Sequence, residues 1–206
     1  MFKYILPCVL LLAACQPNSQ NAVSPPPALQ TQKKEISGSV IRDEKLGSNL
    51  PLAATTGEKI LLNQSSNYIS LLAFGYTSCP DICPTTLLTM GHAVKKLSPE
   101  QAAQVRVYFV TLDPKRDTLE VLQGYVTLFH PDFIGLRPEP EELEQVKKDW
   151  HVIGDIVPLE NGNYTVDHST GIYIIDKKGE TAIYEPYGTS EQQLADDIAL
   201  FLEENK

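Results

Sequence analysis

The chain has 206 residues, of which 42% are hydrophobic and 21% charged, a composition typical of one globular domain of ordinary size. Its formal net charge of -9 provides no basic surface for a phosphate backbone, which disfavours nucleic acid as a partner. The length also disfavours a second domain, and no internal repeat is present.

The N-terminus has the pattern of an export signal. Lys3 precedes an apolar run, Tyr4 to Leu12, that is too short to span a bilayer. The next stretch, L-A-A-C ending at Cys15, is similar to a bacterial lipoprotein signal, in which this cysteine becomes the lipidated first residue. We therefore expect residues 1–14 to be removed and the chain to be anchored by lipid in the bacterial cell envelope, facing the periplasm or the cell exterior. A plain secretory leader is the alternative.

Residues 15–35 are polar and rich in proline, with no apolar period. Such a segment buries too little apolar surface to offset its ordering entropy, so we expect a flexible tether. The folded domain is expected over residues 36–206. Which membrane holds the anchor stays open. With Cys8 removed in the leader and Cys15 carrying lipid, only Cys79 and Cys83 remain as free thiols.

Strands and helices alternate in the first half of this domain. The apolar run from Ile69 to Tyr76 predicts a buried strand, and Pro84 is well placed in the first turn of the helix that follows. A second strand is expected over Val105 to Leu112, because β-branched and aromatic residues dominate it. The apolar spacing from Leu119 to Phe129 then predicts a helix.

The second half predicts a helix, a hairpin and a closing helix. The first of these begins at Pro140 and turns Trp150 inward, and residues 171–176 pair with residues 181–184 around Lys177-Lys178-Gly179. Ser190 and Gln193 have the spacing of a capping box at the start of the last helix. This order predicts an α/β fold, a thioredoxin-like three-layer sandwich with a central mixed sheet and flanking helices.

Two cysteines, Cys79 and Cys83, lie where the first core strand turns into the first helix. Unpaired backbone N–H groups at a helix start favour thiolate, and we expect Cys83 to experience this effect most because it directly precedes Pro84. Exported cysteine pairs usually form structural disulfides, but the ring closed here is small and would stabilise little. A redox-active pair with a reversible disulfide and a metal site both remain open.

The residues between the cysteines, P-D-I, are one more than in the usual C-x-x-C redox motif. The wider loop allows two thiolates to hold one ion, and an added imidazole completes a set that suits Cu(I) or Cu(II). Zinc is an alternative. The candidate histidines are His92, His130, His151 and His168, of which His168 directly precedes a predicted strand. A lone histidine is more often structural, so this assignment also stays open.

Three blocks of sequence appear together: F-G-Y-T-S-C-P-D-I-C-P-T-T-L from Phe74, T-L-D-P-K-R-D-T from Thr111 and V-D-H-S-T-G-I-Y-I-I-D from Val166. In this order and spacing they resemble the signature blocks of the Sco/SenC family. The resemblance runs from about Ile36 to the C-terminus. It implies a membrane-anchored thioredoxin-like protein that binds copper, as Cu(I) and Cu(II), through Cys79, Cys83 and His168.

The resemblance also implies a function and a partner. Proteins of this family act in assembly of the CuA centre of cytochrome c oxidase, as metallochaperones that deliver copper, as reductants of the acceptor's cysteines, or as both. The implied partner is the CuA-bearing subunit, and other copper chaperones or thiol-disulfide reductants are further candidates. Many relatives have histidine where this chain has Ser78, so a fourth possible nitrogen ligand is missing here.

Four acidic residues lie beside these motifs. Asp113 and Asp117 belong to the second block, and we interpret them as loop and helix-cap residues near the site. Asp81 and Asp167 each neighbour an implied ligand and could orient Cys79, Cys83 or His168.

Three functions therefore compete. A copper metallochaperone is favoured over a thiol-disulfide oxidoreductase that acts through Cys79 and Cys83 on CuA-site or other exported cysteines. A thiol peroxidase is the weaker third reading, since peroxiredoxins share the scaffold. Whether the chain is an enzyme stays open, as do the functional copper oxidation state and the oligomeric state.

Overall fold

The centre of the fold is β4 (Ile69–Gly75), in which all seven residues are buried. The computed structural model describes residues 35–204. β4 pairs in parallel with β5 (Val105–Thr111), with Ile69 opposite Val105, and antiparallel with β9 (Ile172–Ile175) on its other side. A strand between two neighbours and covered on both faces has no solvated side, so its continuous apolar sequence is the expected pattern.

The remaining strands extend this sheet at both edges. The order of the eight strands is β1-β10-β9-β4-β5-β6-β2-β3, and parallel and antiparallel pairs are mixed. The outer strands are β1 (Ser39–Val40), β2 (Leu52–Ala54), β3 (Lys59–Ile60), β6 (Ile134–Arg137) and β10 (Thr181–Glu185). A separate two-stranded sheet joins β7 (Gly154–Pro158) to β8 (Tyr164–His168).

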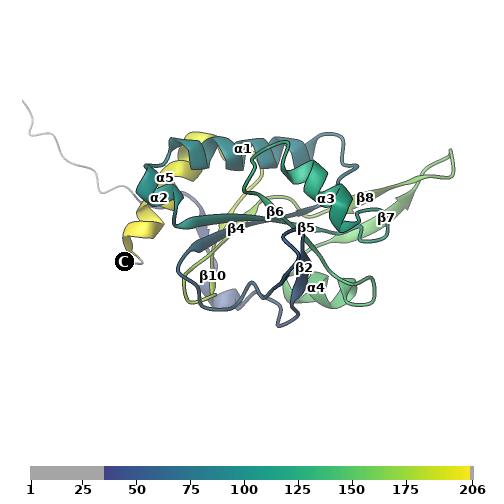
Figure 1. The fold of residues 1–206 in the computed structure, drawn as a ribbon, viewed down its shortest axis with the longest axis horizontal. Helices are drawn as coiled ribbons and strands as arrows, with labels where there is room; N and C mark the ends of the chain where they lie inside the picture. Colours follow the sequence, from purple (N-terminus) through teal and green to yellow (C-terminus); the bar gives the residue numbers. More distant parts are fainter. Residues whose placement is uncertain (1–34, 205–206) are drawn as a thin grey trace, which may run out of the picture. The chain divides into compact units, whose positions relative to one another are not determined.

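Helices cover both faces of the sheet. Figure 1 shows α1, α3 and α5 on one face and α4 on the other, which gives three layers. α1 packs against α5, and α3 packs against β6. The helices are α1 (Ile82–Lys96), α2 (Pro99–Ala102), α3 (Leu119–Val126), α4 (Leu143–Asp149) and α5 (Glu191–Glu204), with a 3-10 turn at Arg42–Glu44. The predicted fold class is confirmed.

An aromatic cluster fixes α4 to the sheet. Trp150 follows α4 and is 1% exposed, and its ring centroid lies 5.6 Å from that of Phe74 and 5.7 Å from that of Tyr173. Phe74 and Tyr173 meet edge-to-face with centroids 5.9 Å apart. Phe74 belongs to β4 and Tyr173 to β9, so Trp150 packs α4 against two strands. The inward position predicted for Trp150 is confirmed.

Several boundaries differ from the sequence expectation. The helix expected from Pro140 begins at Leu143, because residues 140–142 form a turn. α3 ends at Val126 rather than Phe129, and Val121, one of the apolar residues in that predicted stretch, is 44% exposed. The capping box at α5 is confirmed: the N–H of Gln193 donates to the hydroxyl of Ser190 at 3.2 Å, and the Gln193 side chain accepts from the Ser190 N–H at 3.3 Å.

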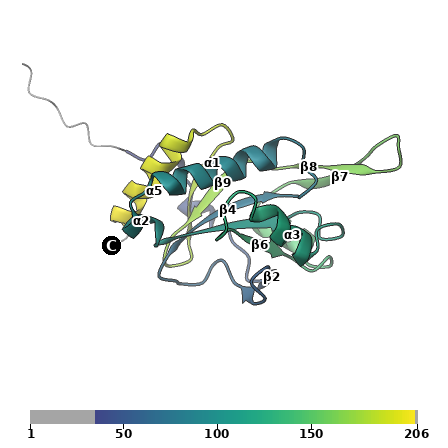
Figure 2. The same ribbon diagram turned by 45° about the horizontal axis from the view of Figure 1, so that its top comes forward.

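The β7–β8 hairpin extends beyond the end of the central sheet, as both ribbon views show (Figures 1 and 2). It lies at the carboxyl ends of the parallel strands, beside the start of α1. No pattern in the sequence predicted this hairpin. Among the described residues, no helix is long and apolar enough to cross a membrane.

A buried pair of carboxyl groups lies where the segment before β1 meets the last helix. Asp197 of α5 accepts the backbone N–H groups of Ser37 and Gly38, at distances between 3.0 and 3.1 Å. Glu185 of β10, which is 1% exposed, lies against this site. Burial, followed by the neighbouring Asp197, raises the pKa of Glu185 from 4.5 to about 8.

We predict that Glu185 makes the folded state less stable as the pH rises. Between about pH 4.5 and about pH 8 the folded chain keeps a proton on Glu185 that the unfolded chain has released, so the free energy of unfolding falls across this range. Glu185→Gln stays neutral, and its denaturation by urea should show a flatter dependence on pH. The exposed Glu203→Gln is the matched control and should keep the wild-type slope. An unchanged slope in Glu185→Gln would contradict the prediction.

Candidate metal centre

The two cysteines lie on either side of the start of α1. Cys79 is in the turn after β4, where its N–H donates to the carbonyl of Tyr76 at 3.2 Å. Asp81 precedes the first helical residue, but its side chain makes no capping hydrogen bond. The Sγ of Cys79 accepts the N–H of Cys83 at 3.5 Å instead. A sulfur therefore satisfies one of the free N–H groups of the helix start, which holds Cys79 against it.

His168 brings the third donor atom to the same point. It is the last residue of β8, and its Nε2 lies 3.7 Å from the Sγ of Cys79 and 3.4 Å from the Sγ of Cys83. Its Nδ1 lies 2.8 Å from the carbonyl oxygen of Ser169. Because a carbonyl can only accept, Nδ1 carries the proton, and in the neutral ring Nε2 presents its lone pair to both sulfurs.

These distances suit one metal ion. The ligand atoms of Cys79, Cys83 and His168 lie within 4.8 Å of one another, and both thiols are free. Bond lengths of about 2.3 Å to sulfur and about 2.0 Å to nitrogen, as in zinc sites, require donor atoms about 3.5 to 4 Å apart. Two sulfurs and one imidazole also match the preference of copper for soft thiolates and nitrogen. The three ligands implied by the family resemblance are thus brought together.

The two thiols differ strongly in acidity. A hydrogen bond from the Cys83 side chain is the largest of the effects that lower the pKa of Cys79, which falls from 9.0 to about 4 although burial opposes it. The backbone N–H groups of Cys83 and Asp81 lower it too. The same bond to Cys79, followed by burial, raises the pKa of Cys83. The pair therefore holds one thiolate, on Cys79, and one proton, on Cys83.

The expectation that Cys83 would be the more acidic thiol is therefore wrong. Its side chain is 2% exposed and points from the helix toward the sheet, where a Cβ added to Gly75 would overlap its Sγ. Cys79 is 9% exposed and receives the N–H donors of the helix start. Direction of the side chain, rather than closeness in sequence to Pro84, decides which sulfur is stabilised as an anion.

Asp117 holds the cysteine loop to the next strand. Its carboxylate is 1% exposed and accepts the N–H of Thr77 at 3.0 Å, the hydroxyl of Thr77 at 2.6 Å and the hydroxyl of Thr111 at 2.6 Å. Asp117 was interpreted as a helix-cap residue, but the cap of α3 is Thr118, whose side chain accepts the N–H of Val121. The other acid of this block, Asp113, pairs with Arg116 and accepts the hydroxyl of Tyr164 at 3.0 Å.

Neither acidic neighbour of the ligands orients them through its carboxylate. Asp81 is exposed, and it acts on Cys79 through its backbone N–H. Asp167 is exposed, and no contact ties its carboxylate to His168 in the described part of the chain. The carbonyl of Ser169 orients His168 instead. This correction follows from strand alternation, because consecutive residues of β8 point to opposite faces.

The remaining candidate residues lie elsewhere. His92 pairs with Glu191 at 2.8 Å, and the ring of His130 accepts the N–H of Asp132 at 3.2 Å. His151 is exposed, with a positive φ of 51°. Cys15, predicted to carry lipid, lies outside the described residues, as do the predicted signal peptide and nearly all of the tether.

The sequence did not reveal the residues that support the ligands. Gly75 allows the close approach of Cys83, and the ring of Tyr76 meets that of His168 edge-on, with centroids 5.7 Å apart. Arg116 of the second block contacts Tyr164, which lies just before the third block and far away in sequence. Gly75, Tyr76 and Arg116 lie inside the quoted blocks, which was the available signal, whereas Tyr164 lies outside them.

Comparison with known proteins identifies the family. The SCO1/SenC family model matches residues 39–203. The chain belongs to the SCO1/SenC family. An SCO2-like protein of Rickettsia typhi is 39% identical over 158 residues, which cover 74% of this chain and 77% of that protein.

Two solved structures carry the same fold with copper bound. The ScoI structure of Arabidopsis thaliana has a TM-score of 0.72 and 28% identity, and covers 77% of this chain and 99% of that one. The ScoI structure of Bradyrhizobium japonicum has a TM-score of 0.69 and 29% identity, and covers 76% of this chain and 99% of that one. The family resemblance drawn from the three sequence blocks is confirmed.

We predict that alkylation of the reduced, metal-free chain will discriminate between the two thiols. Since the pKa of Cys79 is lowered to about 4, its thiolate is fully formed above about pH 6, and its rate of reaction with iodoacetamide should be constant from there to about pH 8. Cys83 should react far more slowly, because its pKa is raised and its side chain is 2% exposed. Peptide mass spectrometry assigns each site, and preferential labelling of Cys83 would contradict the assignment.

We also predict that a single methyl group at Gly75 will disturb the site. Gly75→Ala places Cβ against the Sγ of Cys83 and 2.9 Å from the ring of Phe109, so the sulfur must move. Metal affinity should fall by an order of magnitude or more, by analogy with other changes to the support of metal ligands. Gly124→Ala in α3 is the control, since a Cβ there meets no atom within 4 Å. Calorimetric titration of both variants tests this, and equal affinities would refute it.

Proposed function

We propose that this chain is a copper metallochaperone, which holds one copper ion through Cys79, Cys83 and His168 and transfers it during assembly of the CuA centre of cytochrome c oxidase. One observation carries the proposal most directly. The Nε2 of His168 lies 3.7 Å and 3.4 Å from the two sulfurs, and the bond from Nδ1 to Ser169 turns its lone pair toward them. The copper-bound relatives support it, as does a structural neighbour, BsSco, which is a member of the Sco family of cytochrome c oxidase assembly proteins.

The position of the donors suits delivery of a cargo ion. Two thiolates bind Cu(I), and the imidazole allows the same residues to hold Cu(II) as well. His168 is partly exposed and Cys79 is 9% exposed, so incoming thiolates of an acceptor can reach the ion from the solvent side. Cys83 is the buried ligand, and it stays with the chain until the acceptor has engaged the ion. Transfer then proceeds by ligand exchange and requires no change of fold.

We propose thiol-disulfide exchange as a second function of the same residues, because the pKa of Cys79 is lowered to about 4. The Cys79 thiolate attacks one sulfur of a partner disulfide and releases the other as a thiolate, which leaves a mixed disulfide. Cys83 then loses its proton, which the Nε2 of His168 at 3.4 Å is placed to accept. Attack of Cys83 on Cys79 frees the second partner thiol, so the partner gains two electrons and the chain becomes a disulfide.

The cellular setting completes the proposal. We infer a lipid anchor at Cys15 and a tether that lets the domain reach a membrane-bound oxidase subunit in the envelope of a bacterial cell. The support is the L-A-A-C sequence before Cys15 and the polar, proline-rich residues that follow it. The acceptor would be the CuA-bearing subunit.

We predict that Cu(I) titration of the reduced chain will give one tight equivalent. Cys79→Ser and Cys83→Ser should abolish tight binding, because each removes one of two thiolates. His168→Ala should weaken it and, in the Cu(II) form, change the sulfur-to-copper charge-transfer band. His92→Ala is the matched control, since that ring pairs with Glu191 away from the site. Wild-type affinity in all three ligand variants would end the copper proposal.

The same variants separate the two functions. Electron exchange requires both Cys79 and Cys83. His168 only assists it by accepting the proton of Cys83, which water can also accept, so His168→Ala should retain most of the ability to reduce a disulfide. Oxidase assembly in cells can then be measured as CuA absorbance. Equal loss of assembly in all three variants favours copper delivery, whereas near-normal assembly in His168→Ala favours thiol-disulfide exchange.

A further inference from the structure

His168 approaches the cysteines from a strand outside the central sheet. Among the described strands, β8 pairs only with β7. The bonds between Ile153 and Ser169 join the two sides of the hairpin to each other, not to the cysteine loop. Tyr184 holds the chain just after the hairpin by donating to the carbonyl of Thr170 at 2.6 Å. A two-stranded hairpin is marginally stable alone, so side-chain contacts must fix the rest of β8 relative to the cysteines.

Arg116 provides these contacts from the loop after β5. Its Nε donates to one carboxylate oxygen of Asp113, and its Nη1 donates to the carbonyl of Tyr164 at 3.0 Å and to Asn163 at 3.3 Å. Its guanidinium carbon lies 3.7 Å from the ring centroid of Tyr164. The hydroxyl of Tyr164 donates to the other oxygen of Asp113. One ion pair thus holds the first residue of β8 by its carbonyl, its ring face and its hydroxyl.

The same guanidinium reaches the cysteine loop. It lies 5.7 Å from the ring centroid of Tyr76, a residue that is 3% exposed and whose carbonyl accepts the N–H of Cys79. The hydroxyl of Tyr76 shares a hydrogen bond of 2.7 Å with Thr165 of β8, and its ring meets His168 edge-on. Arg116 therefore contacts both the strand that carries the histidine and the residue at which the cysteine loop begins.

We propose that Arg116, held by Asp113, is a positioning residue of the copper site that clamps β8 against the cysteine loop. Its contacts go to Asp113, Asn163, Tyr164 and Tyr76 rather than to the ligand atoms. Its effect on the metal therefore passes through the placement of His168. The effect on copper affinity rests on the proposed function, whereas the effect on the Tyr76–His168 ring contact in the metal-free chain does not.

The chemistry of the contacts requires arginine. A planar guanidinium can donate in two directions while its face stacks on an aromatic ring, whereas lysine supplies only a point charge. The Nη2 of Arg116 is buried without a hydrogen-bond partner among the described residues. Leaving a buried donor without a partner is destabilising. The side chain nevertheless keeps this orientation, so its contacts with Tyr164, Tyr76 and Asp113 outweigh the loss of that hydrogen bond.

Arg116→Lys tests the clamp, because it keeps the positive charge but loses the stacking on Tyr164 and the planar set of N–H donors that reaches both Asp113 and the carbonyl of Tyr164. Cu(I) affinity of the full chain, measured by competition with a chromophoric chelator, should fall by about 10- to 100-fold, as for other residues that support metal ligands. In the His168→Ala background the same substitution should cause no further loss, since no imidazole remains to be positioned. Equal losses in both backgrounds would indicate a general structural role and overturn the proposal.

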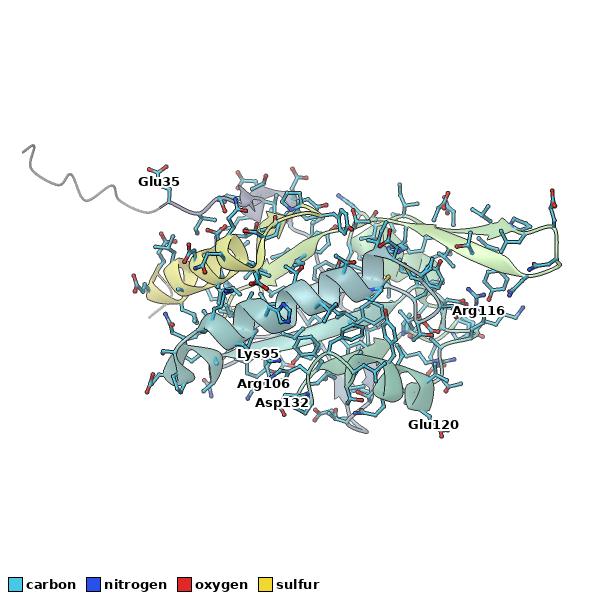
Figure 3. All side chains as sticks on the ribbon, turned by 90° about the horizontal axis from the view of Figure 1, so that it is seen from above. Glu35, Lys95, Arg106, Arg116, Glu120 and Asp132 are labelled. Atoms are coloured by element: carbon cyan, nitrogen blue, oxygen red, sulfur yellow. The ribbon has the colours of Figure 1, made fainter. Side chains whose placement is uncertain are left out.

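Arg106→Lys is the matched control. Arg106 also stacks on a tyrosine, with its guanidinium 5.0 Å from the ring of Tyr68, and donates to the carbonyls of Ala103 and Val105. Figure 3 shows it near Lys95, far from Arg116 at the hairpin. Its replacement should leave copper affinity at the wild-type value. A loss equal to that of Arg116→Lys would count against a specific clamp.

The second readout needs no metal. In the reduced chain, nuclear Overhauser contacts between the ring protons of Tyr76 and His168 report directly on the position of β8. They should be present in the wild type and in Arg106→Lys, and weak or absent in Arg116→Lys. Their retention in Arg116→Lys would overturn the clamp. If the wild type bound no copper, the proposed function would fail while this result still decided the role of Arg116.

A milder variant covers the case in which Arg116→Lys does not fold. Tyr164→Phe removes only the hydroxyl that donates to Asp113 at 3.0 Å. It should weaken the same Tyr76–His168 contacts and lower copper affinity in the same direction by a smaller factor. Contacts and affinity equal to the wild type would refute the proposal.

Discussion

The hydrogen bond from the Nδ1 of His168 to the carbonyl of Ser169 is the constraint on which the site depends. It fixes which ring nitrogen carries the proton and so leaves the lone pair of Nε2 directed at two sulfurs. The bond is local, between neighbouring residues, and therefore sets the direction of the ring but not its place. Placement comes from the contacts of β8 with Tyr76 and Arg116. Direction and place have separate causes, and both are needed for three donors to meet.

The start of α1 divides two chemically identical thiols into an anion and an acid. Cys79 caps the helix with its sulfur, while Cys83 turns toward Gly75 and the sheet. Cys79 lies before the helix, whereas Cys83 lies inside its first turn. The identity of residue 75 therefore supports the site, because only glycine leaves space for the second sulfur.

Patterns within single elements could be predicted from the sequence, and contacts between elements could not. The buried run of β4 and the capping box at Ser190 depend on neighbouring residues, and both were predicted. The β7–β8 hairpin was missed because its exposed apolar residues, such as Ile156 at 62%, do not alternate as in a half-buried strand. The ligand set came from the family resemblance, since spacing alone left His168 among four candidates. The order of thiol acidity was wrong because it depends on side-chain direction.

Metal binding and electron exchange place opposite demands on Cys83. As a copper ligand it must be a thiolate, so binding releases the proton that its raised pKa retains in the metal-free chain. In electron exchange that same proton keeps Cys83 unreactive until Cys79 has formed the mixed disulfide. The Nε2 of His168, 3.4 Å from Cys83, can take this proton only while no metal occupies its lone pair. Under the proposed function the two activities are therefore alternative states of one site, and copper occupancy excludes thiol exchange.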